Sequence, residues 1–233
     1  MTRQGQESGT RGEETRQRLL ETATRLFAAD GFSNVTVRDI CREAHANLAA
    51  VNYHFGDKFE LYMAVIRVAA DIMWSGNDLA MQSDTVPAEQ RLRHYLRTYV
   101  ARLTTIKGPG AWIYRLMQHE QSDPTPAAAW IVDHVMRPRL RYLASVVAEL
   151  LDLPPADIRV FRCAMSVHTQ CLACMPHPFR ALIVKDWNVE PLSPSEIDAS
   201  VDHIAAFSLA GIRAIAQSAA STELTGARLD RQT

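Results

Sequence analysis

Residues 36–55, TVRDICREAHANLAAVNYHF, decide the fold of this chain of 233 residues. The stretch reads as two short helices joined by a tight turn. Thr36 can cap the first helix, and Asp39 three residues later is its capping-box partner. Asn47 can cap the second helix, because its side-chain oxygen can accept a backbone N–H that the helix leaves unpaired. The turn between the two helices falls at His45.

Each of these helices has one apolar face. In the first helix it is formed by Val37, Ile40, Cys41 and Ala44. In the second helix we expect an inward face of Leu48, Val51 and Phe55, and an outer face of Ala49, Ala50, Asn52, Tyr53 and His54. Small alanines permit a close approach to a flat polar partner, an amide can read a base edge, and a phenol or imidazole can hydrogen-bond phosphate. The stretch therefore predicts a helix-turn-helix whose second helix lies in the major groove of DNA.

The surrounding residues add a family resemblance. The run GF-x-x-V-T-V-R-D-I from Gly31, followed by N-Y-H-F-G-x-K-x-x-L from Asn52, resembles the DNA-binding domain of TetR-family transcriptional regulators over roughly residues 13–73. The resemblance implies an all-α fold, with an N-terminal three-helix helix-turn-helix domain, a C-terminal helical ligand-binding and dimerisation domain, and a homodimer. The family usually has glycine at the position of His45, so we expect a positive φ there, at a cost of about 1 kcal/mol.

Three later segments resemble the C-terminal domain of CecR/CerR-type members of the family. They are RLMQHEQSDPTPAAAW (115–130), SVHTQCLACMPHP (166–178) and HIAAFSLAGIRA (203–214). This resemblance implies a small-molecule sensor whose last helices build the dimer interface.

The expected organisation follows from glycines, prolines and apolar periodicity. We expect a disordered arm over 1–12, the DNA-binding domain over 13–73, the C-terminal domain over 74–220 and a polar tail over 221–233. Gly31 should end the first helix, since glycine takes the left-handed conformation without penalty. The later helices are expected over about 57–80, 88–105, 111–121, 127–151, 156–175 and 195–219. Pro138 should kink or split its helix.

Composition alone does not indicate a nucleic-acid partner. The formal net charge is −1, and residues 1–58 hold as many acidic as basic side chains. Placement supports the DNA reading, because several cations can line one side of the domain: Arg11, Arg16, Arg18, Arg38 and Lys58. We therefore expect DNA binding that weakens strongly with salt.

Other features point to a cytoplasmic protein. The first residues are polar and charged, unlike an export signal. Apolar runs stop short of the ~18 residues that a membrane helix needs, so no membrane partner is expected. Four unevenly placed cysteines do not form a disulfide framework and suit a reducing compartment.

We predict two sites. The predicted DNA-binding residues are Thr36, Arg38, Asn47, Ala49, Ala50, Asn52, Tyr53, His54 and Lys58. Ala49 and Asn52 are assigned to bases, and Thr36, Tyr53, His54 and Lys58 to phosphates of a double-stranded, palindromic operator. The predicted ligand-binding residues are Trp112, Arg115, Met117, His119, Glu120, Trp130, Met165, His168, Gln170 and Met175. Aromatic and methionine side chains with a few polar groups are typical of small-ligand sites, although the same residues could simply fill a core.

The combined interpretation is a ligand-responsive repressor that leaves its operator when a partly apolar small molecule binds. Two alternatives stay open: a DNA binder or activator with no small ligand, and a metal or thiol sensor using Cys171 and Cys174. A single CxxC inside a helix is also typical of buried thiols, so no cofactor or metal is predicted. The chain has no glycine-rich phosphate loop, GxSxG or HExxH, and we predict that it is not an enzyme.

Overall fold

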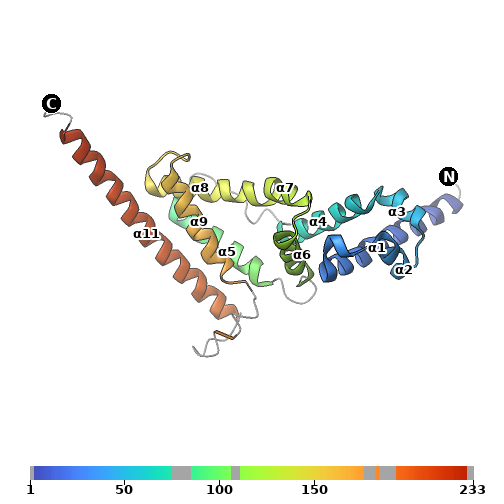
Figure 1. Ribbon diagram of the computed structural model, residues 1–233. Coiled ribbons are helices and arrows are strands. Elements are labelled where there is room, and N and C mark those ends of the chain that lie inside the picture. The colour runs from blue at the N-terminus through green and yellow to red at the C-terminus, as the bar shows by residue number, and fades with distance from the viewer. Residues whose placement is uncertain (1–2, 75–84, 106–110, 176–181, 184–192, 230–233) are drawn as a thin grey trace. The chain divides into compact units, whose positions relative to one another are not determined.

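The computed structural model describes residues 3–74, 85–105, 111–175, 182–183 and 193–229, and these contain helices and no strand (Figure 1). The prediction of an all-α fold is confirmed for this part of the chain. The chain divides into two compact units. The first unit comprises Met1–Ser75 and Gly108–Val135, and the second comprises Gly76–Lys107 and Met136–Thr233.

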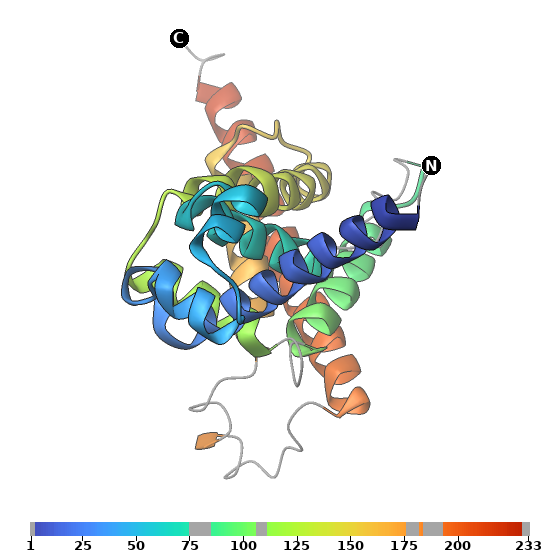
Figure 2. The same ribbon diagram turned by 90° about the vertical axis from the view of Figure 1, so that its right-hand side faces the viewer.

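The first unit is built around its N-terminal helix. Its helices are α1 (Arg3–Asn34), α2 (Val37–Glu43), α3 (Leu48–Phe55), α4 (Lys58–Trp74), α6 (Ala111–Ser122) and α7 (Ala127–Ile131). Helix α1 packs against α2, α3, α4 and α6, while α4 also contacts α3 and α7. The short helices α2 and α3 lie beside α1 in both views (Figures 1 and 2).

Helix α1 differs from the expectation at its start and agrees with it at its end. Residues 3–12, expected as a disordered arm, continue α1. No proline occurs before Pro87, so nothing in this segment prevents the helical hydrogen bonds from propagating. The regular helix breaks at Gly31, which has φ 80° and ψ 167°. The prediction that Gly31 ends the helix is therefore confirmed.

The core of the first unit combines aliphatic and aromatic side chains from α1 to α4 with α6 and α7. Its fully buried members include Leu19, Phe27, Ile40, Val51, Leu61, Tyr62, Leu116 and Ala127. The rings of Phe27 and Tyr62 meet edge to face with centroids 4.9 Å apart. Because Leu116 and Ala127 belong to this core, α6 and α7 group with the helices of the first 75 residues. All residues from 74 to 220 had been expected to belong to the C-terminal domain.

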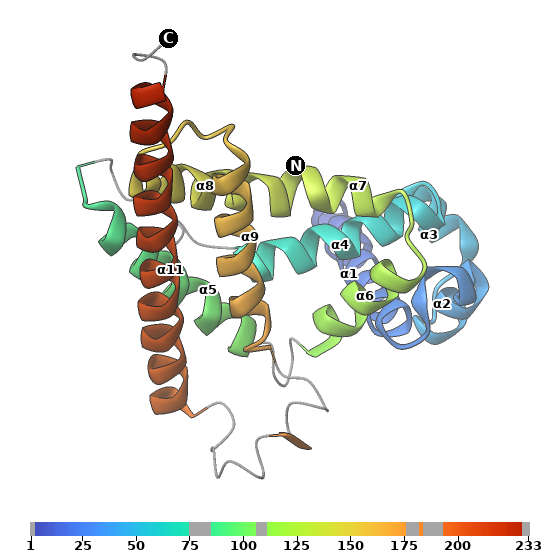
Figure 3. The same ribbon diagram turned by 60° about the vertical axis from the view of Figure 1, so that its left-hand side comes forward.

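The second unit contains α5 (Ala88–Thr105), α8 (Arg137–Leu151), α9 (Ile158–Leu172) and α11 (Pro194–Leu229). The long helix α11 packs along α5, α8 and α9, and α5 also contacts α8 and α9 (Figure 3). Residues 221–229, expected as part of a polar tail, continue α11. An ion pair joins Arg91 of α5 to Glu149 of α8, and another joins Glu89 of α5 to Arg213 of α11.

Pro138 splits the expected helix over 127–151. Helix α7 ends at Ile131, a π-helical segment follows over Val132–Met136, and α8 starts at Arg137 with Pro138 in its first turn. Proline has no N–H to donate to the preceding turn, and a π-helical turn is one way in which a helix accommodates such a gap. The predicted split at Pro138 is confirmed.

Candidate functional site

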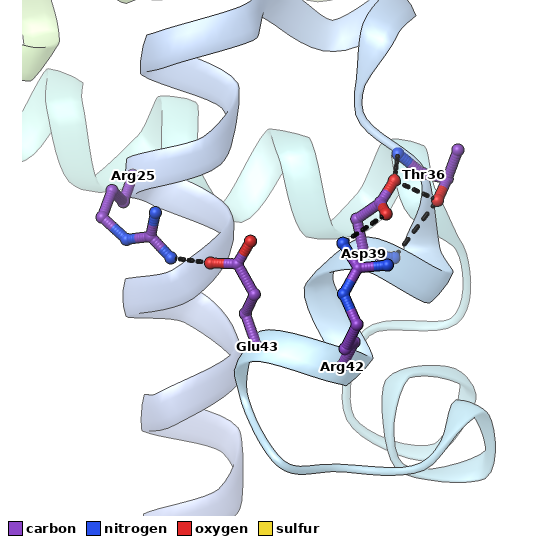
Figure 4. Close-up of polar contacts among 5 residues, drawn as sticks. All are labelled: Arg25, Thr36, Asp39, Arg42 and Glu43. Carbon is purple, nitrogen blue, oxygen red and sulfur yellow. Dashed lines mark hydrogen bonds and ion pairs between the residues drawn. The ribbon is translucent and has the colours of Figure 1, made fainter.

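Helix α2 begins at the predicted capping box (Figure 4). The Asp39 N–H donates to Thr36 Oγ1 at 3.2 Å, and the Thr36 N–H donates to Asp39 Oδ2 at 3.2 Å. The hydrogen bonds from Thr36, and then the Arg42 guanidinium 2.8 Å from Asp39 Oδ1, hold the pKa of Asp39 below its usual range. The predicted role of Thr36 as N-cap is confirmed.

An ion pair anchors the other end of α2. Arg25 of α1 pairs with Glu43 in the last turn of α2 (Figure 4). Both side chains are partly exposed, so this pair contributes at most about 1 kcal/mol. Its value here is geometric, since it fixes the direction of α2 relative to α1.

The turn between α2 and α3 has the positive φ that the family resemblance implies. His45 has a φ of 49°, in the left-handed region that most side chains avoid. The turn is closed by the Ala46 N–H, which donates to the carbonyl of Cys41 at 3.0 Å. A non-glycine residue at the apex therefore carries backbone strain that the surrounding helices must hold in place.

Helix α3 starts at Asn47, whose Oδ1 accepts from the Ala50 N–H at 2.8 Å. Val51 is fully buried, as expected, but Leu48 is 53% exposed. The expectation that Leu48 points inward is wrong. Three residues span 300° of a helix, so the Leu48 side chain points 60° away from that of Val51. The buried side of α3 is centred on Val51, and Leu48 lies outside it. Gly56, with φ 90°, ends the helix.

The outer face of α3 offers small and polar groups to solvent. Ala49, Asn52 and Tyr53 are exposed, and Tyr53 keeps 85% of its accessible surface. Ala50 and His54 are half-buried, and the Tyr53 and His54 rings meet edge-on at 4.9 Å. A short helix of this composition can approach a groove closely and still present an amide and a phenol.

The cations near this face differ in their surroundings. Arg38 of α2 is exposed. Lys58, at the start of α4, is half-buried with its Nζ 4.2 Å from the centroid of the Phe32 ring. Burial lowers the pKa of Lys58. Arg16 lies over the ring of Phe55 at 5.2 Å. Arg38 is thus more open to a phosphate than Lys58 is in this conformation.

The predicted ligand-binding residues divide between the two units. Those of the first unit are Trp112, Arg115, Met117, His119, Glu120 and Trp130, and those of the second are Met165, His168, Gln170 and Met175. Trp112 and Arg115 line an open groove of about 610 Å³ among α1, α4 and α6. Gln170 Nε2 donates to Ser208 Oγ at 3.2 Å, which joins α9 to α11.

Two of the first-unit residues have structural contacts. Glu120 is buried and accepts hydrogen bonds from the Tyr62 hydroxyl at 2.6 Å and the Thr125 hydroxyl at 2.8 Å. His119 lies against Gly31, where a Cβ would come 2.9 Å from its Nδ1. These contacts tie α6 to α4 and to the end of α1, inside the first unit.

The second unit buries His168, one of the predicted ligand-binding residues, together with Arg139, which was not predicted to belong to a site. Arg139 of α8 is only 6% exposed, and its guanidinium lies 4.4 Å from the centroid of the Tyr99 ring. His168 stacks on the same ring at 5.5 Å. Tyr95 and Tyr99 lie four residues apart on the buried face of α5, whereas nothing next to Arg139 in the sequence indicates that its side chain is buried.

Family models match both parts of the chain. The model for the C-terminal domain of the HTH-type transcriptional dual regulator CecR matches residues 88–212, which is more than half of the chain. The model for bacterial regulatory proteins of the tetR family matches residues 19–65. The chain belongs to the TetR family of transcriptional regulators. The family resemblance seen in the sequence is confirmed.

Individual TetR-family relatives agree with this assignment. The dual regulator CecR of Shigella flexneri is 25% identical over 174 residues, covering 70% of this chain and 74% of its own. The repressor AcnR of Corynebacterium efficiens is 27% identical over 157 residues, covering 63% and 75%. Among solved structures, a TetR-like regulator from Rhodococcus sp. RHA1 shares the fold with a TM-score of 0.54, 18% identity and coverage of 85% and 96%. A transcriptional regulator from Saccharomonospora viridis in complex with choline has a TM-score of 0.53, 18% identity and coverage of 84% and 95%.

These TetR-family relatives are regulators, as expected for a chain predicted not to be an enzyme. The cysteines of this TetR-family chain are all buried. Burial is the main cause that raises the pKa of Cys171 to about 12, which disfavours the thiolate that metal binding and thiol chemistry need. Within the described residues, no three His, Cys, Asp or Glu side chains are grouped to hold a metal. The metal or thiol sensor is therefore the weaker alternative.

Proposed function

We propose that this TetR-family regulator binds a palindromic operator as a homodimer, through α3, and is released when a partly apolar small molecule binds it. The observation that carries the DNA-binding part is the outer face of α3, where Ala49, Asn52 and Tyr53 are exposed while the helix is fixed by its N-cap and by buried Val51. A rigid helix with a small, polar outer face meets the requirement for major-groove reading.

Each predicted DNA-binding residue keeps a role in this proposal. Asn52 and Ala49 contact bases, because an amide can pair with a base edge and a methyl can contact thymine. Tyr53, His54 and Arg38 bind phosphates. Ala50 permits the close approach. The remaining three residues lie at the starts of the helices, where they position the motif and approach the DNA backbone: Thr36, Asn47 and Lys58.

Exposed apolar side chains support dimerisation through the last helices. Helix α9 exposes Ile158 (55%) and Phe161 (59%), and α11 exposes Phe207 (65%) and Ile215 (38%). The opposite side of α11 is buried in the second unit, so the helix is apolar on two sides. By length and composition Pro194–Ser218 could also cross a membrane, but an inner face packed on three helices fits a core helix with a second face for another copy better.

The effector and the direction of regulation rest on family likeness. The CecR model matches the C-terminal helices, and the Saccharomonospora viridis protein of this fold carries choline. Release from DNA requires that the effector bind one conformation more tightly than the other. AcnR is a repressor and CecR a dual regulator, so activation at some promoters is the second candidate function. In this proposal, the regulator acts on DNA in the cytoplasm, whether it represses or activates.

Selection from random duplex DNA with the full-length protein tests the proposal. We expect recovered sequences to be palindromic. Asn52→Ala should relax the preference at one position in each half-site by ~1–3 kcal/mol. Arg38→Gln should weaken binding to all sequences equally. It should also reduce by about one the slope of the logarithm of the binding constant against the logarithm of the salt concentration. Arg97→Gln, an exposed substitution on α5 of the second unit, is the matched control and should change neither. A monomer, or a protein that prefers no palindrome at modest ionic strength, would overturn the proposal.

A further inference from the structure

Three helices bring polar side chains into the core of the second unit. Tyr95 and Tyr99 come from α5, Arg139 from α8 and His168 from α9. Their exposed fractions are 0%, 2%, 6% and 3% respectively. Polar side chains are rarely buried in such a group unless they bind one another or a ligand.

The ring of Tyr99 is the centre of this group. The Arg139 guanidinium lies 4.4 Å from its centroid. The His168 ring stacks on it at 5.5 Å with an angle of 10° between the planes. Tyr95 lies beside it, with centroids 5.6 Å apart. One buried cation, one phenol and one imidazole therefore gather around a single aromatic ring.

Two polar atoms of the group, the Tyr95 hydroxyl and His168 Nδ1, make no hydrogen bond of normal geometry among the described residues. The charge of Arg139 acts on both side chains, and Arg139 also interacts directly with the Tyr95 hydroxyl. His168 Nδ1 is therefore the atom that these side chains leave without a partner. A buried imidazole nitrogen in this position, beside a phenol and a guanidinium, points to a bound molecule that supplies the partner, either a water or a ligand atom.

We propose that Tyr95, Arg139 and His168 bind the acidic end of the effector, and that this effector is an organic monocarboxylate with an apolar body. A carboxylate offers two acceptor oxygens, which suit a guanidinium fork together with a phenol or imidazole donor. A dianionic phosphate ester would bring a second negative charge into this core, and burying a charge is costly. The inference rests on the proposed function, since it names the effector of that regulator.

The protonation of His168 fits this assignment. Burial, and then the neighbouring Arg139, lower the pKa of His168 to about 4. The imidazole is therefore neutral at pH 7 and can place one N–H toward an acceptor. Arg139 provides a positive charge in the group. The same unit also buries aliphatic side chains on the same helices, such as Leu96 of α5 and Val167 of α9, which are suited to an apolar body.

Calorimetric titration of the full-length protein, without DNA, tests the site. The probes are linear monocarboxylates from acetate to decanoate and phenylacetate, each paired with its neutral amide, and octyl phosphate. We expect at least one carboxylate to bind, and its amide to bind at least tenfold more weakly. Arg139→Gln should weaken that carboxylate at least tenfold and Tyr95→Phe at least threefold. Arg141→Gln, an exposed arginine on the same helix, and Tyr114→Phe should stay within twofold of the unsubstituted protein.

Several outcomes would overturn the site. One is that no carboxylate binds, and another is that an amide binds as well as its acid. The others are that Arg139→Gln has no effect on binding, or that octyl phosphate binds more tightly than every carboxylate. Circular dichroism checks the fold of each variant. If Arg139→Gln does not fold, Tyr95→Phe decides, because it removes one oxygen only. The measurement uses no DNA, so the two proposals can fail separately. If the protein selects a palindrome but binds no carboxylate, only this inference is wrong. If it binds a carboxylate but selects no palindrome, only the operator proposal is wrong.

Discussion

Replacing Tyr62 by phenylalanine removes one buried oxygen that joins α4 to α6 in the first unit. The Tyr62 hydroxyl donates to Glu120 Oε1 at 2.6 Å, and both side chains are buried. A hydrogen bond to a charged group contributes ~1.5–3 kcal/mol. In the variant, Glu120 keeps the hydrogen bonds from the Thr125 hydroxyl at 2.8 Å and from the Thr125 N–H at 3.2 Å. The buried carboxylate therefore loses one of its hydrogen bonds but is not left without a donor.

We expect Tyr62→Phe to lower the free energy of unfolding by about 2 kcal/mol. For a chain of this size that loss corresponds to a Tm lower by about 4–8 °C. Tyr114→Phe is the matched control, because the Tyr114 hydroxyl accepts a hydrogen bond from Gln118, one turn away on the surface of α6. The control should change the free energy of unfolding by less than ~0.5 kcal/mol.

Tyr62→Phe should also make the free energy of unfolding depend less steeply on pH in alkaline solution. Burial, and then the hydrogen bond and charge of Glu120, raise the pKa of Tyr62 above its usual value. The folded chain therefore keeps this proton to higher pH than the unfolded chain does. The stabilisation is fully present below pH ~10 and is lost as the pH rises further. Removing the Tyr62 hydroxyl should reduce this loss of stability by up to about 1.4 kcal/mol per pH unit. Tyr95 and Tyr99, whose pKa values burial also raises, should keep some alkaline sensitivity in the variant.

Urea denaturation at pH 8 and at several points above pH 10, followed by circular dichroism, measures both effects. A loss below ~0.5 kcal/mol at pH 8 would show that the short Tyr62–Glu120 contact adds nothing beyond packing. An unchanged slope above pH 10 would refute the assignment of a raised pKa to this phenol.

Three further predictions follow from the helix ends and the last helix. Asn47→Ala should lower stability by ~1 kcal/mol, measured as a lower Tm, because the Ala50 N–H loses its cap; an unchanged Tm would contradict the cap. His45→Gly should raise stability by roughly 0.5 kcal/mol, because relief of left-handed strain exceeds the added chain entropy of glycine, with DNA binding retained; a lower Tm would argue against strain in the turn. Phe207→Glu should give a monomer by light scattering with weakened operator binding, while Gln217→Glu, an exposed substitution further along α11, should leave the dimer intact; a dimeric Phe207→Glu protein would move the interface elsewhere.

Local signals made much of the helix-turn-helix predictable. The capping residues Thr36 and Asn47 and the breaks at Gly31 and Pro138 each depend on a few neighbouring residues, whereas the positive φ of His45 was expected from the family resemblance. Such features are readable because the chemistry of a cap or turn acts over one helical turn.

Tertiary features were less accessible. Leu48 was expected to be buried, but its neighbours in space, not its spacing, decide that it is exposed. The burial of Arg139 depends on α5 and α9 closing around it, and nothing within α8 indicates this. Glu120 was selected as a polar group for a ligand, and its hydrogen bond to Tyr62, 58 residues away in sequence, shows a second use that no periodicity encodes. The DNA-binding residues stay predictions, although the structure places most of them at the motif's exposed or half-buried surface.

The burial of all four cysteines gives this protein a practical property for spectroscopy. Their side chains are at most 8% exposed, and burial raises the pKa of Cys41, Cys163 and Cys171. Exposed thiolates attack maleimide dyes, so the buried native thiols should label slowly. A cysteine introduced at exposed Ala49 would take up a fluorophore first, and the native core would not have to be altered to make a probe on the outer face of α3.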